Sequence, residues 1–342
     1  MPQPIVERGT LMKVLDHGYV RIINFMGNDE EIVEAARMSN DKGFISWNHY
    51  VRCKNCTKVL YAPPDGHVVV PSDDCVTPVT RRSTGEVVGS ATGKHDWEHF
   101  PHGDLGLLDN LWRKKHATPF EMGELVIEVQ APIMVFREWH RHRTQSYNEF
   151  SARYSVMPNI HYIPERERIQ KQSTANKQGS AEQMDDDTSS QVRAELERQQ
   201  QEIYDYYEGW CESGVAREVA RINTPVSRYS KMRAKGNIRN WFQFLNLRMR
   251  PDAQYEIRQY ANEVGKILSW LWPKAYSFFE EYDLYGAHFS RTELKALRTI
   301  LMKANVVEQV ELMKVFEEHG LKGTKLKEFQ EKLREGGDKI LS

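Results

Sequence analysis

Residues 131–155 read APIMVFREWHRHRTQSYNEFSARYS, an apolar segment that leads into a cluster of arginines. Pro132 suits the first turn of a helix, so the apolar residues behind it predict a helix. A basic run, Arg141-His142-Arg143, follows this segment. The guanidinium fork matches phosphate oxygens in pairs and keeps its charge, so such a cluster is suited to binding an anion. The alternative is a solvated basic turn whose arginines pair with nearby glutamates.

Upstream of this stretch, the pattern predicts a hairpin and a helix. Residues 11–27 alternate β-branched and aromatic side chains around a turn at His17 and Gly18, which is typical of a hairpin. Asn28 follows as a helix N-cap, with Glu31 three residues later and the apolar-periodic run EIVEAARM behind it.

Residues 51–104 differ from the rest of the chain in composition, because Gly, Pro, Asp and Thr are frequent there. This composition predicts an insertion built from small hairpins. A helix is expected at 105–115 with Asp104 as its cap, and the alternating residues 124–130 predict a strand.

Helical patterns dominate the second half of the chain. The polar, low-complexity residues 165–192 predict a mobile surface loop. Helices are expected at about 193–212, 214–222, 237–248 and 253–281, and a capping box from Ser290 to Glu293 begins helices rich in Lys and Glu. A few strands followed by many helices predict an α+β protein with one main core. We expect a domain over 1–285 and a helical extension over 286–342, which is either a solvated appendage or a docking element.

Composition excludes several functional classes. The 342 residues are 40% hydrophobic and 28% charged, which is typical of a soluble globular protein. A net charge of -1 gives no global field for nucleic acid, so an anion site must be a local cluster and no nucleic-acid partner is expected. No apolar run approaches the roughly 20 residues that span a bilayer, and the N-terminus lacks the apolar core of a signal peptide. We therefore expect a cytoplasmic protein without a membrane partner.

Ordered blocks of the chain resemble the flavin-dependent thymidylate synthases. The hallmark of that family is Arg-His-Arg, seven residues and then Ser, which here is Arg141-His142-Arg143 followed by Ser151. The further blocks are KHATPFE (115–121), APIMVFREWHRHR (131–143), ESGVAREVARINTP (212–225), FLNLRMRPDAQYEIRQYA (244–261) and GNDEEIVEAAR (27–37). The resemblance covers most of residues 11–280, except the insertion and the polar loop.

The resemblance implies a sheet packed with several long helices, in a homotetramer whose active sites draw residues from several subunits. It implies dUMP as substrate, FAD as cofactor, and NADPH and methylenetetrahydrofolate as co-substrates. The expected FAD ligands are Thr118, Arg141, His142, Arg143, Glu149, Asn237, Arg239 and Gln243. The expected dUMP ligands are Glu138, Arg141, Ser151, Ala152, Arg153, Arg221 and Arg248.

Three residues are expected at the reacting groups. Arg248 would face the uracil and favour its N3-ionised form, Ser151 would bind the nucleotide, and His116 would lie where folate or NADPH reaches the flavin. The chain departs from the family pattern at Glu138, where many relatives have Gln; the carboxylate would contact the base or neutralise Arg141. Gln243 and Asp252 likewise replace a common Asn and a common His.

The family route needs no cysteine nucleophile. Cys211 lies in a helical stretch without a basic neighbour to lower its pKa, which favours a packing role. Two other functions stay open: a nucleotide-binding module without catalysis, and a flavoenzyme that methylates uracil in another nucleotide.

The insertion carries Cys53-x-x-Cys56 and Cys75, which a histidine would complete as a zinc site. The histidines available are His67, His95, His99 and His102, of which His67 is the nearest in sequence after the pair. A strong zinc signal has two such cysteine pairs, and only one is present. The sequence therefore favours ordinary thiols and no metal, with zinc as the second interpretation and a redox pair as the third.

Overall fold

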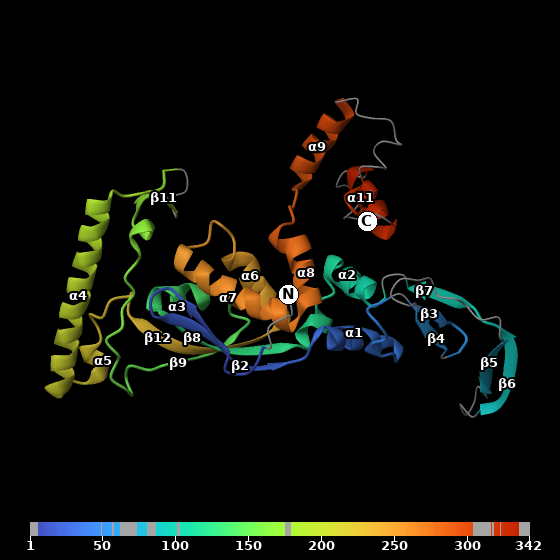
Figure 1. Cartoon of the computed structure of the whole chain (residues 1–342), viewed down its shortest axis with the longest axis horizontal. Coiled ribbons are helices and arrows are strands. Elements are labelled where there is room, and N and C mark those ends of the chain that lie inside the picture. The colour runs from blue at the N-terminus through green and yellow to red at the C-terminus, as the bar shows by residue number, and fades with distance from the viewer. Residues whose placement is uncertain are drawn as a thin grey trace. The chain divides into compact units, whose positions relative to one another are not determined.

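The computed structural model describes residues 6–48, 50–56, 58–61, 74–80, 87–100, 103–174, 179–303, 316, 318–321 and 323–334. Its contacts divide the chain into two compact units, Met1–Leu284 and Tyr285–Ser342. Figure 1 shows the helices and strands of both.

A five-stranded antiparallel sheet forms the centre of the first unit. The strand order is β1-β2-β8-β12-β9. The strands are β1 (Leu11–Val14), β2 (Gly18–Met26), β8 (Glu124–Pro132), β9 (Ser146–Glu149) and β12 (Tyr229–Asn237). The predicted hairpin over 11–27 and the predicted strand at 124–130 are confirmed, while β9 and β12 were not predicted.

Strand β12 pairs with β8 along its whole length, from Tyr229 opposite Pro132 to Asn237 opposite Glu124. Its side chains alternate between buried and exposed positions, as an antiparallel strand with one covered face requires. The buried positions include Ser230, Ala234 and Gly236, which are too small or too polar to give a hydrophobic alternation in the sequence. The strand is therefore defined by its neighbours β8 and β9.

Helices cover one face of this sheet, as Figure 1 shows for α6 and α7. The helices that the structure describes in the first unit include α1 (Asp29–Arg37), α2 (Leu105–Arg113), α3 (Ile133–Trp139), α6 (Ile238–Arg248), α7 (Tyr255–Leu271) and α8 (Pro273–Phe279). Between helices and sheet lies an aromatic core in which Trp139 stacks on Phe244 with a ring separation of 4.5 Å. Large aromatic side chains bury much apolar surface each, so this core fixes α3 against α6.

Two of the predicted capping signals, at Asn28 and at Ser290, are confirmed. The side chain of Asn28 accepts a hydrogen bond from the backbone N–H of Glu31 at 3.0 Å, so Asn28 caps α1. The second unit contains α9 (Arg291–Lys303) and α11 (Gly323–Arg334). Before α9, the carboxylate of Glu293 accepts from the backbone N–H of Ser290 at 2.7 Å, and Oγ of Ser290 accepts from the backbone N–H of Glu293 at 3.3 Å.

The predicted loop over 165–192 is wrong in its described part. The segment contains a 3-10 turn η3 (Arg166–Arg168), a hairpin of β10 (Gln170–Gln172) with β11 (Ser180–Gln183), and the beginning of helix α4 (Asp186–Glu212). Asp185 caps α4 by accepting from the backbone N–H of Thr188 at 2.8 Å. A polar stretch with a good N-cap can begin a helix without an apolar period, because the cap satisfies the exposed N–H groups. Residues 175–178 of this segment lie outside the described residues.

The two other helix predictions in this half need correction at their bounds. The predicted helix at 253–281 is broken, because Trp272 leaves the helical conformation and Pro273 begins α8 before a π-helical turn at Glu280–Leu284. Proline cannot supply the N–H that a continuous helix needs. The predicted helix at 214–222 is the short α5 (Arg217–Ala220). The helix at 237–248 is confirmed as α6, capped by Asn237, which accepts from Asn240.

The described part of the insertion consists of short antiparallel strands, as predicted. Strands β3 (Tyr50–Cys53), β4 (Val59–Tyr61) and β7 (Trp97–Phe100) form one sheet in the order β4-β3-β7. Strands β5 (Asp74–Thr80) and β6 (Val87–Lys94) pair with each other.

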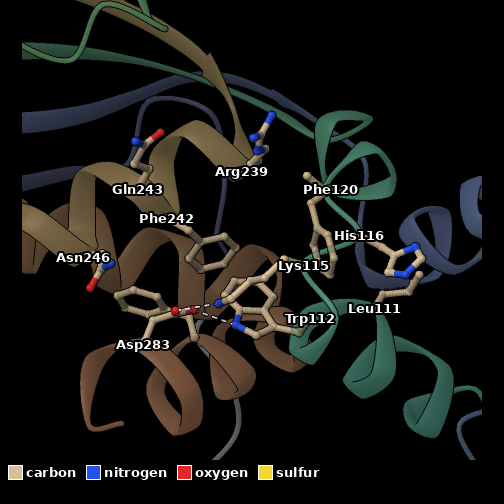
Figure 2. A pocket seen from close by; sticks show the side chains of 12 residues that line it. Leu111, Trp112, Lys115, His116, Phe120, Arg239, Phe242, Gln243, Asn246 and Asp283 are labelled. Atoms are coloured by element: carbon tan, nitrogen blue, oxygen red, sulfur yellow. Dashed lines mark hydrogen bonds and ion pairs between the residues drawn. The ribbon is translucent and has the colours of Figure 1, made fainter. Parts of the chain in front are cut away.

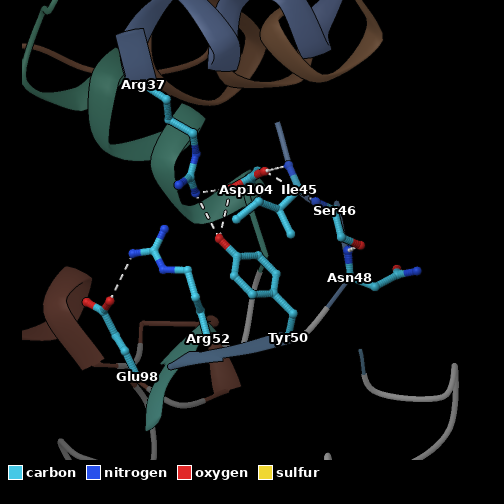
Figure 3. Close-up of polar contacts among 8 residues, drawn as sticks. All are labelled: Arg37, Ile45, Ser46, Asn48, Tyr50, Arg52, Glu98 and Asp104. Carbon is cyan, nitrogen blue, oxygen red and sulfur yellow. Dashed lines mark hydrogen bonds and ion pairs between the residues drawn. The ribbon is translucent and has the colours of Figure 1, made fainter. Parts of the chain in front are cut away.

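Asp104 precedes α2, but its side chain does not cap that helix, so this prediction is wrong. Figure 3 shows the carboxylate turned toward Arg37 and Tyr50 instead. Arg37 forms an ion pair with it and donates to the Tyr50 hydroxyl at 2.8 Å, and the backbone N–H of Ile45 donates to Asp104 at 2.7 Å. Because the Asp104 side chain is fully buried, it needs this charged partner, and the network joins the base of the insertion to α1.

Among the helices that the structure describes, none has the length and apolar character needed to cross a lipid bilayer.

Candidate active site

The basic run lies in a tight turn between α3 and β9. Helix α3 ends at Trp139, four residues before the end of the run, because the chain turns where Trp139 is buried in the aromatic core. The hydroxyl of Tyr147 donates to the carbonyl oxygen of His142 at 2.7 Å and holds the turn. Arg141 and Arg143 are exposed, and within the described residues neither side chain has a hydrogen bond or an ion pair. The turn therefore presents two uncompensated positive charges.

Arg248, the last residue of α6, is held by two predicted site residues. Its Nε donates to Nε2 of His142 at 3.0 Å, its Nη1 to the carboxylate of Glu138 at 2.9 Å and its Nη2 to the carbonyl oxygen of Glu138 at 3.0 Å. The alternative that Glu138 neutralises Arg141 does not hold in this structure, since its carboxylate pairs with Arg248.

Burial sets the protonation of this cluster. Burial, and then the charge of Arg248, lower the pKa of His142 to about 4, so the ring is neutral at pH 7 and accepts from Arg248. Burial raises the pKa of Glu138, and the neighbouring Arg248 opposes that rise. The result is a guanidinium fixed in orientation by a neutral ring and a carboxylate.

A second group of predicted residues meets at the turn after β9. Ala152 packs with Ala220 in a small apolar cluster, which also contains Met157 and Tyr207. This contact brings the turn with Ser151 and Arg153 beside the end of α5, where Arg221 follows Ala220. The side chains of Arg153 and Arg221 thus belong to one neighbourhood. Nε of Arg153 lies 3.6 Å from the exposed carboxylate of Glu218, while the side chain of Arg221 has no hydrogen bond or ion pair within the described residues.

Arg228 was missed by the sequence analysis. Nη1 of its guanidinium is buried and has no hydrogen-bond partner among the described residues. Burial and the charge of Arg221 lower the pKa of Arg228, and the charge of Glu149 opposes them, so these three residues act on one another. Glu149 in turn accepts from the hydroxyl of Ser230 at 2.9 Å. A buried donor without a partner costs about 1–3 kcal/mol, so the position is suited to an anion that completes it.

A pocket of about 290 Å³ opens between α2, α6 and the end of the first unit. Figure 2 shows Arg239 and Gln243 projecting from α6 and His116 from the segment after α2. Aromatic rings of Trp112, Phe120, Phe242 and Phe279 also line it. Asp283 accepts from Nε1 of Trp112 at 2.7 Å and from Nζ of Lys115 at 2.8 Å. Three predicted residues, far apart in the sequence, thus share one aromatic pocket.

The remaining predicted residues lie outside this pocket. Thr118 begins the 3-10 turn η2 (Thr118–Glu121), whose Glu121 forms an ion pair with Arg239. The side chain of Asn237 serves as the cap of α6. None of Arg141, Arg143, Ser151, Arg153 and Arg221 lines the pocket. Within one chain the predicted ligands therefore form separate groups.

Cys211 lies in the last turn of α4 and packs against the small apolar cluster of Ala152 and Ala220. Asp252 forms an exposed ion pair with Arg250 at 3.0 Å.

Two family models match the chain. The model described as "Thymidylate synthase complementing protein" matches residues 21–274, and that described as "Thymidylate synthase ThyX C-terminal domain" matches residues 287–338. The C-terminal extension, which the resemblance in the sequence left out, thus also has counterparts.

Curated relatives and a solved structure agree with these models. A flavin-dependent thymidylate synthase of Thermus thermophilus is 37% identical over 98% of this chain and 100% of its own length. That of Wolbachia pipientis wMel is 36% identical over 87% of this chain and 86% of its own. The crystal structure of a UMP/dUMP methylase, PolB, from Streptomyces cacaoi with bound 5-Br UMP is similar with a TM-score of 0.58 and 25% identity, covering 80% of this chain and 98% of PolB.

Proposed function

This chain belongs to the family of flavin-dependent thymidylate synthases, and we propose that it methylates dUMP to dTMP on bound FAD, with methylenetetrahydrofolate and NADPH as co-substrates. The observation that carries the proposal is the fixed Arg248 guanidinium beside the turn of Arg141 and Arg143. This arrangement combines a charge aimed at a base with a cluster suited to phosphate.

The residues of this chain fit FAD by their chemistry. Arg141, Arg143 and Arg239 would hold its phosphates, and the aromatic pocket with His116 and Gln243 would take the ring system. The pocket volume of about 290 Å³ lies at the lower end of the range for small-molecule sites. The pocket and the exposed arginines are separate on one chain, which supports a homotetramer whose subunits share each site. When bound, FAD supplies the hydride that reduces the pyrimidine carbon.

Arg248 would act on the uracil through its charge. His142 and Glu138 hold three of its N–H groups, and each terminal nitrogen keeps a second N–H for a uracil oxygen. A charge already held in place stabilises the N3-ionised base without reorganising during the reaction. Glu138 would thus position Arg248, and its carboxylate would lie at the edge of the base.

Arg153, Arg221 and Arg228 would bind the nucleotide phosphate. Among the described residues, Nη1 of Arg228 and the side chain of Arg221 have no partner, and the side chain of Arg153 forms an exposed pair with Glu218. Backbone N–H groups near Ser151 and Ala152 would add neutral donors. No cysteine takes part in this scheme, since Cys211 packs in the small apolar cluster.

The proposal is tested with purified protein. Its visible spectrum should show bound flavin, and release of tritium from 5-labelled dUMP together with dTMP formation should require FAD, NADPH and methylenetetrahydrofolate. The matched UMP reaction measures discrimination at the ribose, because the similar PolB structure is that of a UMP/dUMP methylase. Formation of dTMP that persists after FAD is stripped would contradict the proposal, and turnover of UMP in preference to dUMP would change the substrate.

A further inference from the structure

The insertion brings two cysteines and a histidine together. The ligand atoms of Cys53, Cys56 and His95 all lie within 4.8 Å of one another, and Sγ of Cys56 is 3.7 Å from Nδ1 of His95. Zinc binds sulfur at ~2.3 Å and imidazole nitrogen at ~2.0–2.1 Å, so tetrahedral geometry places such a pair ~3.6 Å apart. The observed separation therefore already matches that of two ligands on one ion.

The backbone holds the two sides of this cluster in place. Cys53 ends β3, and its N–H donates to the carbonyl oxygen of Lys58 at 3.0 Å, which closes the turn toward β4. The N–H of Lys54 donates to the carbonyl oxygen of Asp96 at 2.9 Å and ties the turn to the segment that carries His95. Since β3 also pairs with β7, with Cys53 opposite Trp97, the ligand atoms converge through the sheet itself.

The side-chain environment also suits a metal. The backbone N–H of Asn55 points at Sγ of Cys53 with a separation of 3.4 Å, and such donors stabilise negative charge on sulfur. The ring of His95 stacks on Trp97 at 4.6 Å, which fixes its orientation. Nε2 of His95 is buried and has no hydrogen-bond partner in the described part of the chain, and Nδ1 meets only the sulfur of Cys56. Within the part of the chain that the structure describes, this imidazole therefore lacks the oxygen partners that a structural histidine normally has.

The small sheet of β3, β4 and β7 is expected to need stabilisation beyond its own strand pairing. Strands β3, β4 and β7 contain only 4, 3 and 4 residues, although Tyr50, Val51 and Cys53 of β3 are buried. Such short strands are marginal without further stabilisation, and small modules often obtain it from a metal that closes a loop. The cysteine pair lies in a turn between β3 and β4 and not at a helix N-terminus, where the thiols of redox pairs are often activated.

We propose that Cys53, Cys56 and His95 bind a zinc ion that fixes the turn after β3 to the segment before β7. Both thiols bind as thiolates, so two protons leave when the ion enters. A water molecule fills the fourth tetrahedral position, as at other zinc sites with three protein ligands. His67, the histidine that the sequence favoured, lies outside the described residues, and His95 takes its place in the ligand set. The side chain of Cys75 also lies outside the described part of the chain.

Metal content and cobalt substitution test the site on the full chain, expressed with added zinc and purified without a histidine tag. Elemental analysis should find about one zinc per chain, falling to background in Cys56→Ser and in His95→Gln. Cys211→Ser, which removes a thiol elsewhere, should keep the wild-type content. Cobalt(II) added to reduced, metal-stripped protein should give a thiolate charge-transfer band, which should be lost in Cys56→Ser and kept in Cys211→Ser.

Circular dichroism of each variant shows whether the main domain stays folded, so that lost metal is not confused with lost structure. Chelation of zinc from the wild type should also produce new protease cuts within 50–61 or 94–100 and nowhere in the five-stranded sheet. Wild-type protein without zinc or a cobalt band would overturn the proposal. Zinc retained in both ligand variants would overturn it too. A Cys53–Cys56 disulfide in fresh protein that takes up no metal after reduction would point instead to a redox pair.

Discussion

At the scale of single residues, burial fixes which hydrogen-bond and ion-pair partners a side chain has. Arg248 is the clearest example, because a neutral ring and a carboxylate 106 and 110 residues away fix its guanidinium. A charge held in a fixed orientation lowers a reaction barrier where charge develops on a bound ligand. For this reason Arg248 is the main support for the proposed function.

Replacement of Arg248 tests its role toward the base. Arg248→Ala should lower kcat by about 10²–10³, because the charge that stabilises the ionised uracil is lost. Bound flavin should persist in the visible spectrum, since the proposed FAD ligands are other residues. Arg250→Ala, which removes an exposed arginine of the same segment, is the control and should retain wild-type turnover. An Arg248→Ala enzyme with near wild-type kcat would refute the assignment.

His142 predicts how stability depends on pH. Its pKa is about 4 in the folded protein against 6.5 for the unperturbed group, so the unfolded chain binds more protons between these values. With respect to His142, the free energy of unfolding is therefore highest above about pH 6.5 and falls as the pH drops from there toward 4. Urea unfolding at pH 7 and pH 5 should show a smaller loss in His142→Gln than in the wild type. The exposed His288→Gln is the control, and equal losses in His142→Gln and wild type would exclude the explanation.

At the scale of helices and strands, the sequence predicted the elements that are defined by residues close together in the chain. The hairpin over 11–27, the cap at Asn28 and helix α6 follow from alternation, from a side chain three residues away and from helical spacing. Strand β12 and the early start of α4 were missed, because the first depends on pairing with β8 and the second begins in a polar stretch. Asp104 was misassigned, because Arg37 competes for its carboxylate.

The Asp104 network should determine how firmly the insertion is anchored. Asp104→Asn should destabilise the protein by about 3–5 kcal/mol, because it leaves the buried Arg37 without a counter-ion. Denaturant unfolding measures the loss, and proteolysis should show new cuts near Ile45 and Ser46, whose N–H groups the carboxylate accepts. Asp96→Asn breaks only the exposed pair with Lys54 and should cost less than ~1 kcal/mol. Equal effects of the two variants would show that the network does not anchor the insertion.

On the scale of the whole molecule, the proposed ligands form separate groups on one chain. His116, Arg239 and Gln243 line the aromatic pocket, while Arg153 and Arg221 lie near the small apolar cluster. A site that uses both groups can be completed by another subunit, which is how the proposed homotetramer would work.

Mixed tetramers test this sharing. Arg239→Ala and Arg221→Ala should each be nearly inactive, and co-expression should restore about a quarter of wild-type activity, since random pairing leaves that share of sites intact. Arg153→Ala mixed with Arg221→Ala is the control and should restore nothing, because both residues belong to one group. Failure of the first mixture to recover activity would place each site within a single chain.

The sequence by itself determined the family blocks, the arginine turn and the capped helices, because these depend on residues close together in the chain. Only the tertiary structure decided that Glu138 pairs with Arg248, that the half-buried Arg228 lies near Glu149 and Arg221, and that His95 joins Cys53 and Cys56. Each of these contacts joins residues that the fold brings together from distant segments, and burial then selects the partner. A buried charge or thiol is stable only with the groups that packing places around it, and local pattern does not contain those groups.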